Sequence, residues 1–274
     1  MNRRIVLTIV CFVSLDLAGP SAAATLPDRI VARGKLIVAI VPNYPPMEFR
    51  DPASNALTGF DVDLGEALAG KLGVKIEWQE TAFEQMIPAL ATSRVDAILS
   101  GMSDLASRHE AASFVDYLRS GPQFFTRSAR ASEFAEMNAL CGKSVGASRR
   151  TSFPKEIAAW SDAHCGDKPI NFVGTEGSGD ARTQLKQGRI DAAVQGNETL
   201  PYVMAQEPNV YFLIGAPIGA QLTGIAVGKD DKDLQGAVAG ALDALIADGS
   251  YRALLDKWRL TSNGIEKATI NAGQ

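Results

Sequence analysis

The residues whose types and spacing best suit a binding chemistry lie between Val95 and Arg108. A short apolar run, Val95 to Leu99, stops at Ser100, Gly101 and Ser103, and Arg108 follows within one turn. Hydroxyl groups and the planar arginine fork both donate hydrogen bonds to carboxylates. A glycine lets a ligand approach the backbone closely. Together these residues predict a small carboxylate cradle.

The position of this cradle follows from the run before it. A continuous apolar run predicts a buried parallel strand, and ligands of open α/β sheets bind beyond the carboxyl ends of strands. The segment after Ser103 has the pattern of a helix start, whose free amides would favour an anion. The alternative is structural: Ser103 or Asp104 only caps this helix, and Arg108 forms a surface ion pair with Glu110 or Asp116.

The N-terminus has the pattern of an export signal. Arg3 and Arg4 precede an apolar run over residues 5–13, and small residues end at Ala24. This order predicts a signal peptide over residues 1–24, cleaved after Ala24, and therefore a periplasmic protein. The apolar run is too short to span a bilayer.

The charge balance excludes one class of partner. The chain has 274 residues, with 27 basic and 31 acidic side chains and a net charge of −4. Nucleic-acid binding needs a basic face, so no nucleic-acid partner is expected. His109 and His164 are far apart, no metal-ligand spacing is present and no cofactor motif occurs.

The cysteines predict one covalent crosslink. Cleavage of the leader removes Cys11 and leaves Cys141 and Cys165. Two cysteines in an oxidising compartment predict a single disulfide.

The elements that must position the cradle alternate along the chain. The expected strands cover 35–41, 74–78 and 95–99. Between them we expect a helix that opens within residues 59–64 with an aspartate as its N-cap, and a helix with Pro88 in its first turn. This β-α-β-α-β order predicts a parallel sheet with helices on both faces. A second unit, residues 140–198, repeats the architecture, and the polar tail after Thr261 is expected to be poorly ordered.

Eight segments carry a resemblance to a known family. They are Y-P-P-M-E-F, G-F-D-V-D-L, M-I-P-A-L, V-D-A-I-L-S-G-M-S, F-V-D-Y, G-K-S-V-G-A-S, G-R-I-D-A-A-V-Q and D-G-S-Y-R-A-L-L-D-K-W. In this order and spacing, the chain from about Arg33 to Leu260 resembles the polar amino-acid family of periplasmic solute-binding proteins of ABC importers, family 3.

This resemblance implies an α/β fold with two lobes joined by two crossover strands. Each lobe would be a parallel-rich sheet flanked by helices, the type II fold of periplasmic binding proteins. Lobe 1 would be discontinuous, 25–121 and 220–274, and lobe 2 would be 122–219. The protein would be a monomer that closes over a small molecule and delivers it to a membrane permease.

The resemblance also implies ligand-binding residues. An aromatic pair would sandwich the ligand, the cradle would hold its α-carboxylate, and a lobe 2 threonine would complete the site. These residues are Tyr44, Phe83, Ser100, Gly101, Ser103, Arg108 and Thr151. From the sequence alone, Tyr44 is either a core lid or an aromatic wall of the site.

Two departures from the family bear on the ligand. Arg150 stands where a glycine is usual, and Gly196 stands where an acidic residue pairs with the α-ammonium group. Glu198 is the nearest replacement for that acid. An added cation at Arg150 favours an acidic amino acid, a dicarboxylate or a carboxylate without a free amine. The alternative is that Arg149 and Arg150 are exposed loop residues.

Three functions compete at this level. The first is a binding module without chemistry, because no Ser-His-Asp or Cys-His set is present. The second is an enzyme on the same fold, of the cyclohexadienyl (prephenate or arogenate) dehydratase type, with Glu198 or Glu176 as the acid. The third is a detached sensor domain, but no segment after the leader could carry a signal across a membrane.

Overall fold

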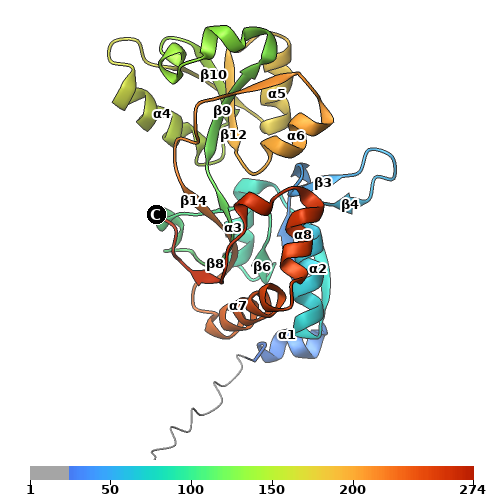
Figure 1. Ribbon diagram of the computed structural model, residues 1–274. Helices are drawn as coiled ribbons and strands as arrows, with labels where there is room; N and C mark the ends of the chain where they lie inside the picture. Colours follow the sequence, from blue (N-terminus) through green and yellow to red (C-terminus); the bar gives the residue numbers. More distant parts are fainter. Residues whose placement is uncertain (1–24) are drawn as a thin grey trace, which may run out of the picture.

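The chain folds into two lobes, each built on its own sheet (Figure 1). The computed structural model describes residues 25–274, so the predicted leader lies outside the described residues. We call the part built on the seven-stranded sheet lobe 1 and the part built on the five-stranded sheet lobe 2. This arrangement confirms the predicted two-lobed α/β class. In the described part of the chain, no helix combines the length and the apolarity that crossing a membrane requires.

Lobe 1 contains elements from both ends of the chain. Its main sheet has β1 (Lys35–Ile40), β5 (Lys75–Glu80), β6 (Ala97–Ile98), β7 (Ser103–Asp104), β8 (Ala112–Ser120), β14 (Gln221–Gly228) and β15 (Thr269–Ile270). Its helices are α1 (Asp28–Arg33), α2 (Phe60–Leu72), α3 (Phe83–Ala91), α7 (Lys232–Ala247) and α8 (Ser250–Trp258). Strands β2 (Asn43–Tyr44), β3 (Glu48–Arg50) and β4 (Leu57–Thr58) form a small third sheet. Strands β5, β1 and β6 run parallel, whereas β14, β8 and β15 pair antiparallel.

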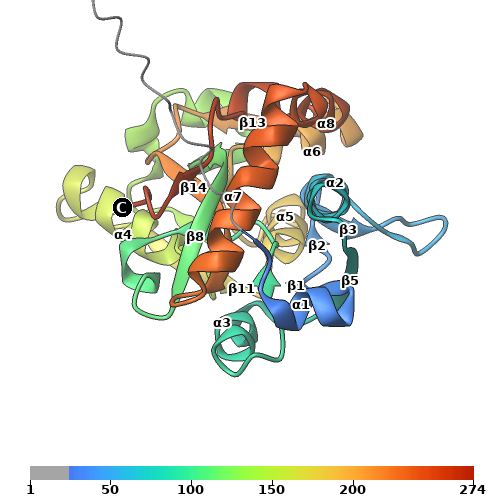
Figure 2. The same cartoon turned by 90° about the horizontal axis from the view of Figure 1, so that it is seen from below.

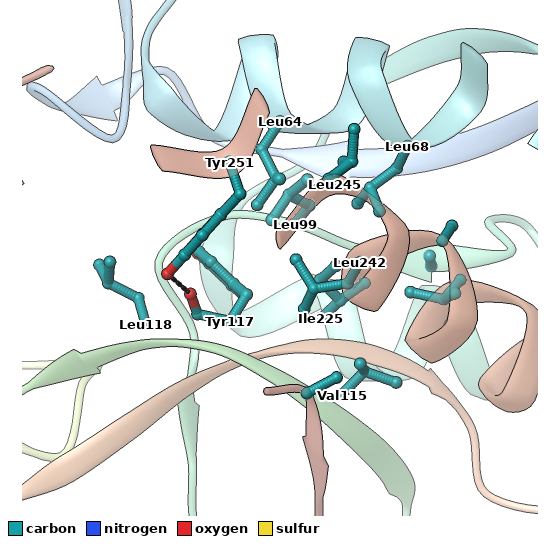
Figure 3. Packing of buried hydrophobic residues seen from close by; sticks show 14 of the residues in the cluster. Leu64, Leu68, Leu99, Val115, Tyr117, Leu118, Ile225, Leu242, Leu245 and Tyr251 are labelled. Atoms are coloured by element: carbon teal, nitrogen blue, oxygen red, sulfur yellow. Dashed lines mark hydrogen bonds between the residues drawn. The ribbon is translucent and has the colours of Figure 1, made fainter. Parts of the chain in front are cut away.

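Helices cover both faces of this sheet. Successive side chains of a strand point to opposite faces, so Val38 packs with α2 and α7 while Ala39 packs with α3. Figure 2 shows α7 lying across the sheet with α2 beside it. Leucines four or three apart on α2 and α7 interdigitate in this core, as Figure 3 shows. They are Leu64, Leu68, Leu242 and Leu245.

Lobe 2 is formed by the middle of the chain. Its sheet has the order β11-β10-β12-β9-β13. These strands are β9 (Pro122–Arg127), β10 (Ser144–Ser148), β11 (Asn171–Thr175), β12 (Ala192–Gly196) and β13 (Tyr211–Ile214). Its helices are α4 (Phe153–His164), α5 (Ser178–Lys186) and α6 (Leu200–Gln206), with 3₁₀ turns at Ser128–Phe134 and Met137–Leu140. The predicted disulfide between Cys141 and Cys165 is confirmed, with an S–S distance of 2.06 Å.

Two strand connections run side by side between the lobes (Figure 1). One joins β8 to β9 through Gly121, and the other joins β13 to β14 through Gly219. A Cβ atom placed on Gly121 would lie 2.2 Å from the carbonyl oxygen of Gly219. Glycine at position 121 therefore lets the two connections approach closely.

The expectation of a poorly ordered tail is wrong. After a 3₁₀ turn at Thr261–Asn263, strand β15 pairs with β8 at the edge of the main sheet. The Asn271 amide donates to the carbonyl of Phe114 at 3.1 Å. The free edge of β8 leaves backbone groups that need partners, and a polar tail supplies them as well as an apolar one would.

Three predicted details of the helices are also wrong. After Ser103 the chain pairs with β14 as β7, and only a 3₁₀ turn at Ala106–Arg108 follows, so no helix begins at the cradle. Helix α2 begins behind Gly59, so no aspartate is its N-cap, and Asp61 is buried in the first turn. Pro88 lies inside α3, beyond the first turn.

Candidate functional site

A cleft between the lobes collects residues from both of them. It encloses about 840 Å³ of empty space, open solvent included. Eight of the predicted site residues line it. They are Tyr44, Phe83, Ser100, Gly101, Ser103, Arg108, Arg150 and Thr151. Glu198 does not line this space and lies buried next to Tyr44.

Ser100 and Gly101 use their donors on carboxyl groups of the protein itself. The Ser100 hydroxyl donates to Oε1 of Glu48 at 2.8 Å, and the Gly101 amide donates to Oδ2 of Asp61 at 2.8 Å. Gly101 has a φ of +56°, and a Cβ there would lie 3.1 Å from the ring of Tyr44. Only glycine accepts both conditions without strain. This end of the cradle therefore holds two buried carboxyl groups of the protein itself.

Arg108 is positioned at the other end of the cradle. Its Nη1 donates to the carbonyl of Ser103 at 2.6 Å, and its guanidinium group lies 5.8 Å from the ring centroid of Phe83. Burial lowers the pKa of Arg108, but an arginine remains charged in proteins. Among the described residues, no carboxylate forms an ion pair with Arg108, so the ion pair with Glu110 or Asp116 is not formed. The guanidinium group keeps donors for another partner.

The lobe 2 side of the cleft presents a hydroxyl and a paired cation. The Thr151 hydroxyl donates to the carbonyl of Ser148 at 2.9 Å. Nη1 of Arg150 lies 2.9 Å from a carboxylate oxygen of Glu84 and 3.8 Å from one of Glu176. Because Glu84 belongs to α3 of lobe 1, the Arg150 pair connects the two lobes. Arg150 thus faces the cleft with its charge balanced by the protein.

Tyr44 also connects the two lobes. Its hydroxyl donates to Oε1 of Glu198 at 2.9 Å and accepts a hydrogen bond from the Gly196 amide at 3.1 Å. A Cβ on Gly196 would lie only 2.0 Å from Oε1 of Glu198. The Glu198 carboxyl group therefore occupies the space that a side chain at position 196 would need. Of the two sequence readings of Tyr44, the structure places it in the wall of the cleft.

Three buried carboxyl groups gather near Tyr44. We call Glu48, Asp61 and Glu198 the acid cluster. Burial raises the pKa of Asp61 and of Glu198 to about 7. Burial, and then the charge of Asp61, raises the pKa of Glu48. In the described chain none of the three has a lysine or arginine ion-pair partner, and Oε2 of both Glu48 and Glu198 has no hydrogen-bond donor.

Sequence reasoning named Glu198 but missed Glu48, Asp61 and Glu84 as parts of this site. Glu48 stands in the segment Y-P-P-M-E-F, and its signal was an acidic side chain inside an otherwise apolar loop. Asp61 stands in a segment where an aspartate was expected to cap a helix, which is the usual role of an aspartate at a helix start. Only the fold brings these two residues next to Ser100 and Gly101.

Comparisons with known proteins agree with this architecture. The model of the bacterial extracellular solute-binding proteins, family 3, matches residues 36–261. The L-arginine-binding protein of Pseudomonas aeruginosa is 30% identical over 249 residues, which cover 88% of this chain and 91% of that protein. The histidine-binding periplasmic protein of Salmonella typhimurium is 27% identical over 252 residues, covering 89% and 95%.

Solved structures of amino-acid-binding proteins are also similar to this chain. Holo ArgBP from T. maritima has a TM-score of 0.71 and 31% identity, over 85% of this chain and 100% of that chain. The named relatives are binding proteins rather than enzymes. The family match spans most of the chain, and the cleft between two lobes agrees with that match. This chain therefore belongs to the bacterial extracellular solute-binding proteins, family 3.

Proposed function

We propose that this protein captures an α-amino acid between its lobes in the periplasm and delivers it to the permease of an ABC importer. The observation that carries the proposal is the charge arrangement of the cleft. Arg108 lines the cleft without a carboxylate partner among the described residues, and Glu48 of the acid cluster lines the same cleft. A carboxylate at Arg108 and a positive group near the acid cluster complement these charges.

The paired state of Arg150 bears on the class of ligand. An acidic amino acid was one prediction from the sequence, because an added cation would need a second negative group. Glu84 and Glu176 already supply that negative charge. With Arg150 neutralised and Glu48 facing the cleft, the balance favours a basic or neutral polar amino acid. Relatives named for binding arginine and histidine support the same choice.

The other lining residues take proposed roles that fit their positions. Phe83 and Tyr44 provide the aromatic walls around the aliphatic part of the ligand. Ser103 and Thr151 contribute hydroxyls from the two lobes beside Arg108. Closure of the lobes about the paired connections at Gly121 and Gly219 would remove the ligand from water and present a closed form to the permease.

The dehydratase alternative has little structural support. Glu176 is largely exposed and paired with Arg149 at 2.9 Å, which does not make it a general acid. Glu198 has a raised pKa, but its carboxyl group is bonded to Tyr44 and does not line the cleft. A buried carboxyl without access to the substrate cannot transfer a proton to it.

The test is a thermal-shift panel on the mature protein after extensive dialysis. The probes are arginine, lysine, histidine, glutamine, glutamate and succinate. We expect the largest stabilisation from a basic amino acid, a smaller one from glutamine and none from succinate. Stabilisation by glutamate or succinate alone would overturn the ligand class, and no response to any amino acid would overturn the proposed function.

A further inference from the structure

We propose that the acid cluster exchanges a proton for the ligand: capture of an amino acid with a cationic side chain releases one proton from Glu48, Asp61 and Glu198. This inference rests on the proposed function and adds to it a coupling between binding and protonation. It concerns the part of the cleft next to Tyr44 and Glu48, where the described residues show three buried carboxyl groups and no basic ion-pair partner.

The geometry makes the three carboxyl groups one unit. Glu48 is 1% exposed, Asp61 0% and Glu198 4%. Glu48 alone of the three lines the cleft. Its Oε1 accepts a hydrogen bond from the Ser100 hydroxyl, and its carboxyl group lies within hydrogen-bonding reach of that of Asp61, so these two groups share one proton. Asp61 lies behind it, held by the Gly101 amide and by the hydroxyl of Tyr117 at 2.9 Å.

The groups that face the cluster come from several elements. Tyr44 of β2, Tyr117 of β8 and the three carboxyl groups from β3, α2 and the loop after β12 interact with one another. Burial raises the pKa of both tyrosines, so they remain neutral donors at neutral pH. Arg182 of α5 is a cation near Tyr44, but its Nη1 donates to Oε1 of Gln195 at 3.0 Å.

Because no cation pairs with the acid cluster, protonation is what limits its negative charge in the empty cleft. Three ionised carboxylates buried without a cation would repel one another and lose their hydration, which costs far more than retaining a proton. A bound metal ion does not balance this charge either, because no group of three or more His, Cys, Asp or Glu side chains in the described residues is arranged to hold one. The empty cleft therefore keeps at least one carboxyl group protonated near neutral pH, in line with the raised pKa values of the cluster.

A bound cation reverses this balance. A guanidinium or ammonium group beside Glu48 favours the ionised form and lowers the pKa of the cluster. The proton leaves to buffer, and the positive charge of the ligand replaces it. By linkage, the affinity for such a ligand rises by up to about tenfold per pH unit while the empty cluster is still protonated, and becomes level once it is ionised. A ligand with a neutral side chain releases no proton.

Isothermal titration calorimetry measures the release directly. L-Arginine is titrated into the dialysed mature protein at pH 6.5 in phosphate and again in a buffer with a large protonation enthalpy, such as imidazole. Arginine's own guanidinium stays charged throughout. We expect the two observed enthalpies to differ by nearly one buffer protonation, and arginine affinity to rise between pH 5.5 and 6.5. L-Glutamine, with the same α-groups, is the internal control and should show no buffer dependence.

Variants assign the proton to the cluster. Glu48→Gln and Glu198→Gln preserve shape and should each reduce the proton release and the arginine affinity by at least about tenfold while changing glutamine affinity little. Asp116→Asn removes another buried carboxyl group with a raised pKa, which does not line the cleft, and should keep the full release. Thermal unfolding of each variant checks that it is folded, and either of the two cluster variants suffices if the other does not fold.

The outcomes separate this inference from the proposed function. Arginine binding without buffer dependence, equal release with glutamine, or full release in both cluster variants would each overturn the proton exchange and leave amino-acid capture standing. Failure of the wild-type protein to bind any amino acid would instead overturn the proposed function itself.

Discussion

Single residues at the cleft show how context decides a role that residue type leaves open. Arg108 and Arg150 are both arginines after a strand end, and the sequence suggested a binding role for each. The structure pairs Arg150 with Glu84 and Glu176 and leaves Arg108 without a carboxylate among the described residues. An unpaired, half-buried arginine lowers stability unless a ligand forms an ion pair with it. Arg108 is therefore the better candidate to bind the carboxylate of the ligand.

Replacement of Arg108 tests that choice. We expect Arg108→Ala to lose about 3 kcal/mol of ligand affinity, roughly a hundredfold in Kd, because a bidentate charged hydrogen bond is removed. Calorimetry with arginine measures the loss, and the melting temperature of the empty protein should change little. The matched control is Arg149→Ala, whose exposed pair with Glu176 should contribute almost nothing. Unchanged affinity in Arg108→Ala would contradict the assignment.

A second residue-scale prediction concerns Tyr44. Tyr44→Phe keeps the aromatic wall but leaves Oε1 of Glu198 and the Gly196 amide without their shared partner. Leaving buried polar groups unsatisfied costs about 1–3 kcal/mol, so the unfolding free energy should fall by that amount. Urea unfolding of the ligand-free protein gives the value. Stability equal to the wild type would mean that water or another group replaces the hydroxyl.

Elements illustrate a different limit of sequence patterns. Strand β15 lies in a polar tail, yet it completes the edge of the main sheet because β8 offers unpaired backbone groups there. The hydroxyl of Thr269 in this strand donates a hydrogen bond to Oδ2 of Asp116 at 2.7 Å. Backbone pairing needs no apolar pattern, so hydropathy did not reveal this strand.

The crosslink in lobe 2 yields the prediction at the scale of elements. The bond between Cys141 and Cys165 joins residues separated by 24 positions, ahead of β10 and behind α4. On the chain-entropy model, such a loop contributes roughly 3 kcal/mol. The Cys141→Ser/Cys165→Ser variant should therefore unfold at lower urea concentration, with ligand affinity retained. Thiol titration of the denatured, non-reduced wild type should find no free thiol, and two reactive thiols would refute the bond.

At the scale of the whole molecule, the two lobes meet through polar and aromatic contacts from distant segments. The pair of Arg150 with Glu84 and the bond of Tyr44 to Glu198 span the cleft. Tyr202 of α6 lies near Phe49 of β3, with ring centroids 5.9 Å apart. The buried acid cluster sits at this junction, so its protonation affects the stability of the entire chain.

This arrangement predicts an unusual dependence of stability on pH. The folded-state pKa values of Asp61, Asp116 and Glu198 are raised to about 7, so the folded state binds more protons than the unfolded state between pH 4 and 7. Their stabilising contribution is complete below their ordinary pKa values, near 4, and is lost as the pH rises through about 7. Carboxylates with lowered pKa values, such as Asp191, change the unfolding free energy only below about pH 4, where they become protonated.

We therefore expect the ligand-free protein to melt at a lower temperature at pH 8 than at pH 5.5. Differential scanning calorimetry in buffers of equal ionic strength measures the difference. Glu198→Gln removes one of the titrating groups and should reduce it. A melting temperature that rises from pH 5.5 to 8 would show that the cluster is ionised in the folded protein without cost.

The sequence by itself determined the class of fold, most of the strands and helices, the disulfide and eight of the residues that line the cleft. Those features depend on local hydrophobic periodicity, on glycines at the ends of elements and on a family resemblance that spans the chain. All three can be read from the order of residues alone. Eight of the nine predicted site residues line one cleft because strand ends of parallel sheets converge.

Only the tertiary structure decided the charges of that cleft. Whether Arg150 is free or paired depends on Glu84, which lies 66 positions earlier and in the other lobe. Whether Asp61 caps a helix or joins Glu48 depends on where α2 packs against the Ser100–Gly101 turn. Ion pairing and desolvation depend on distances between segments far apart in the chain, and local pattern contains no information about those distances.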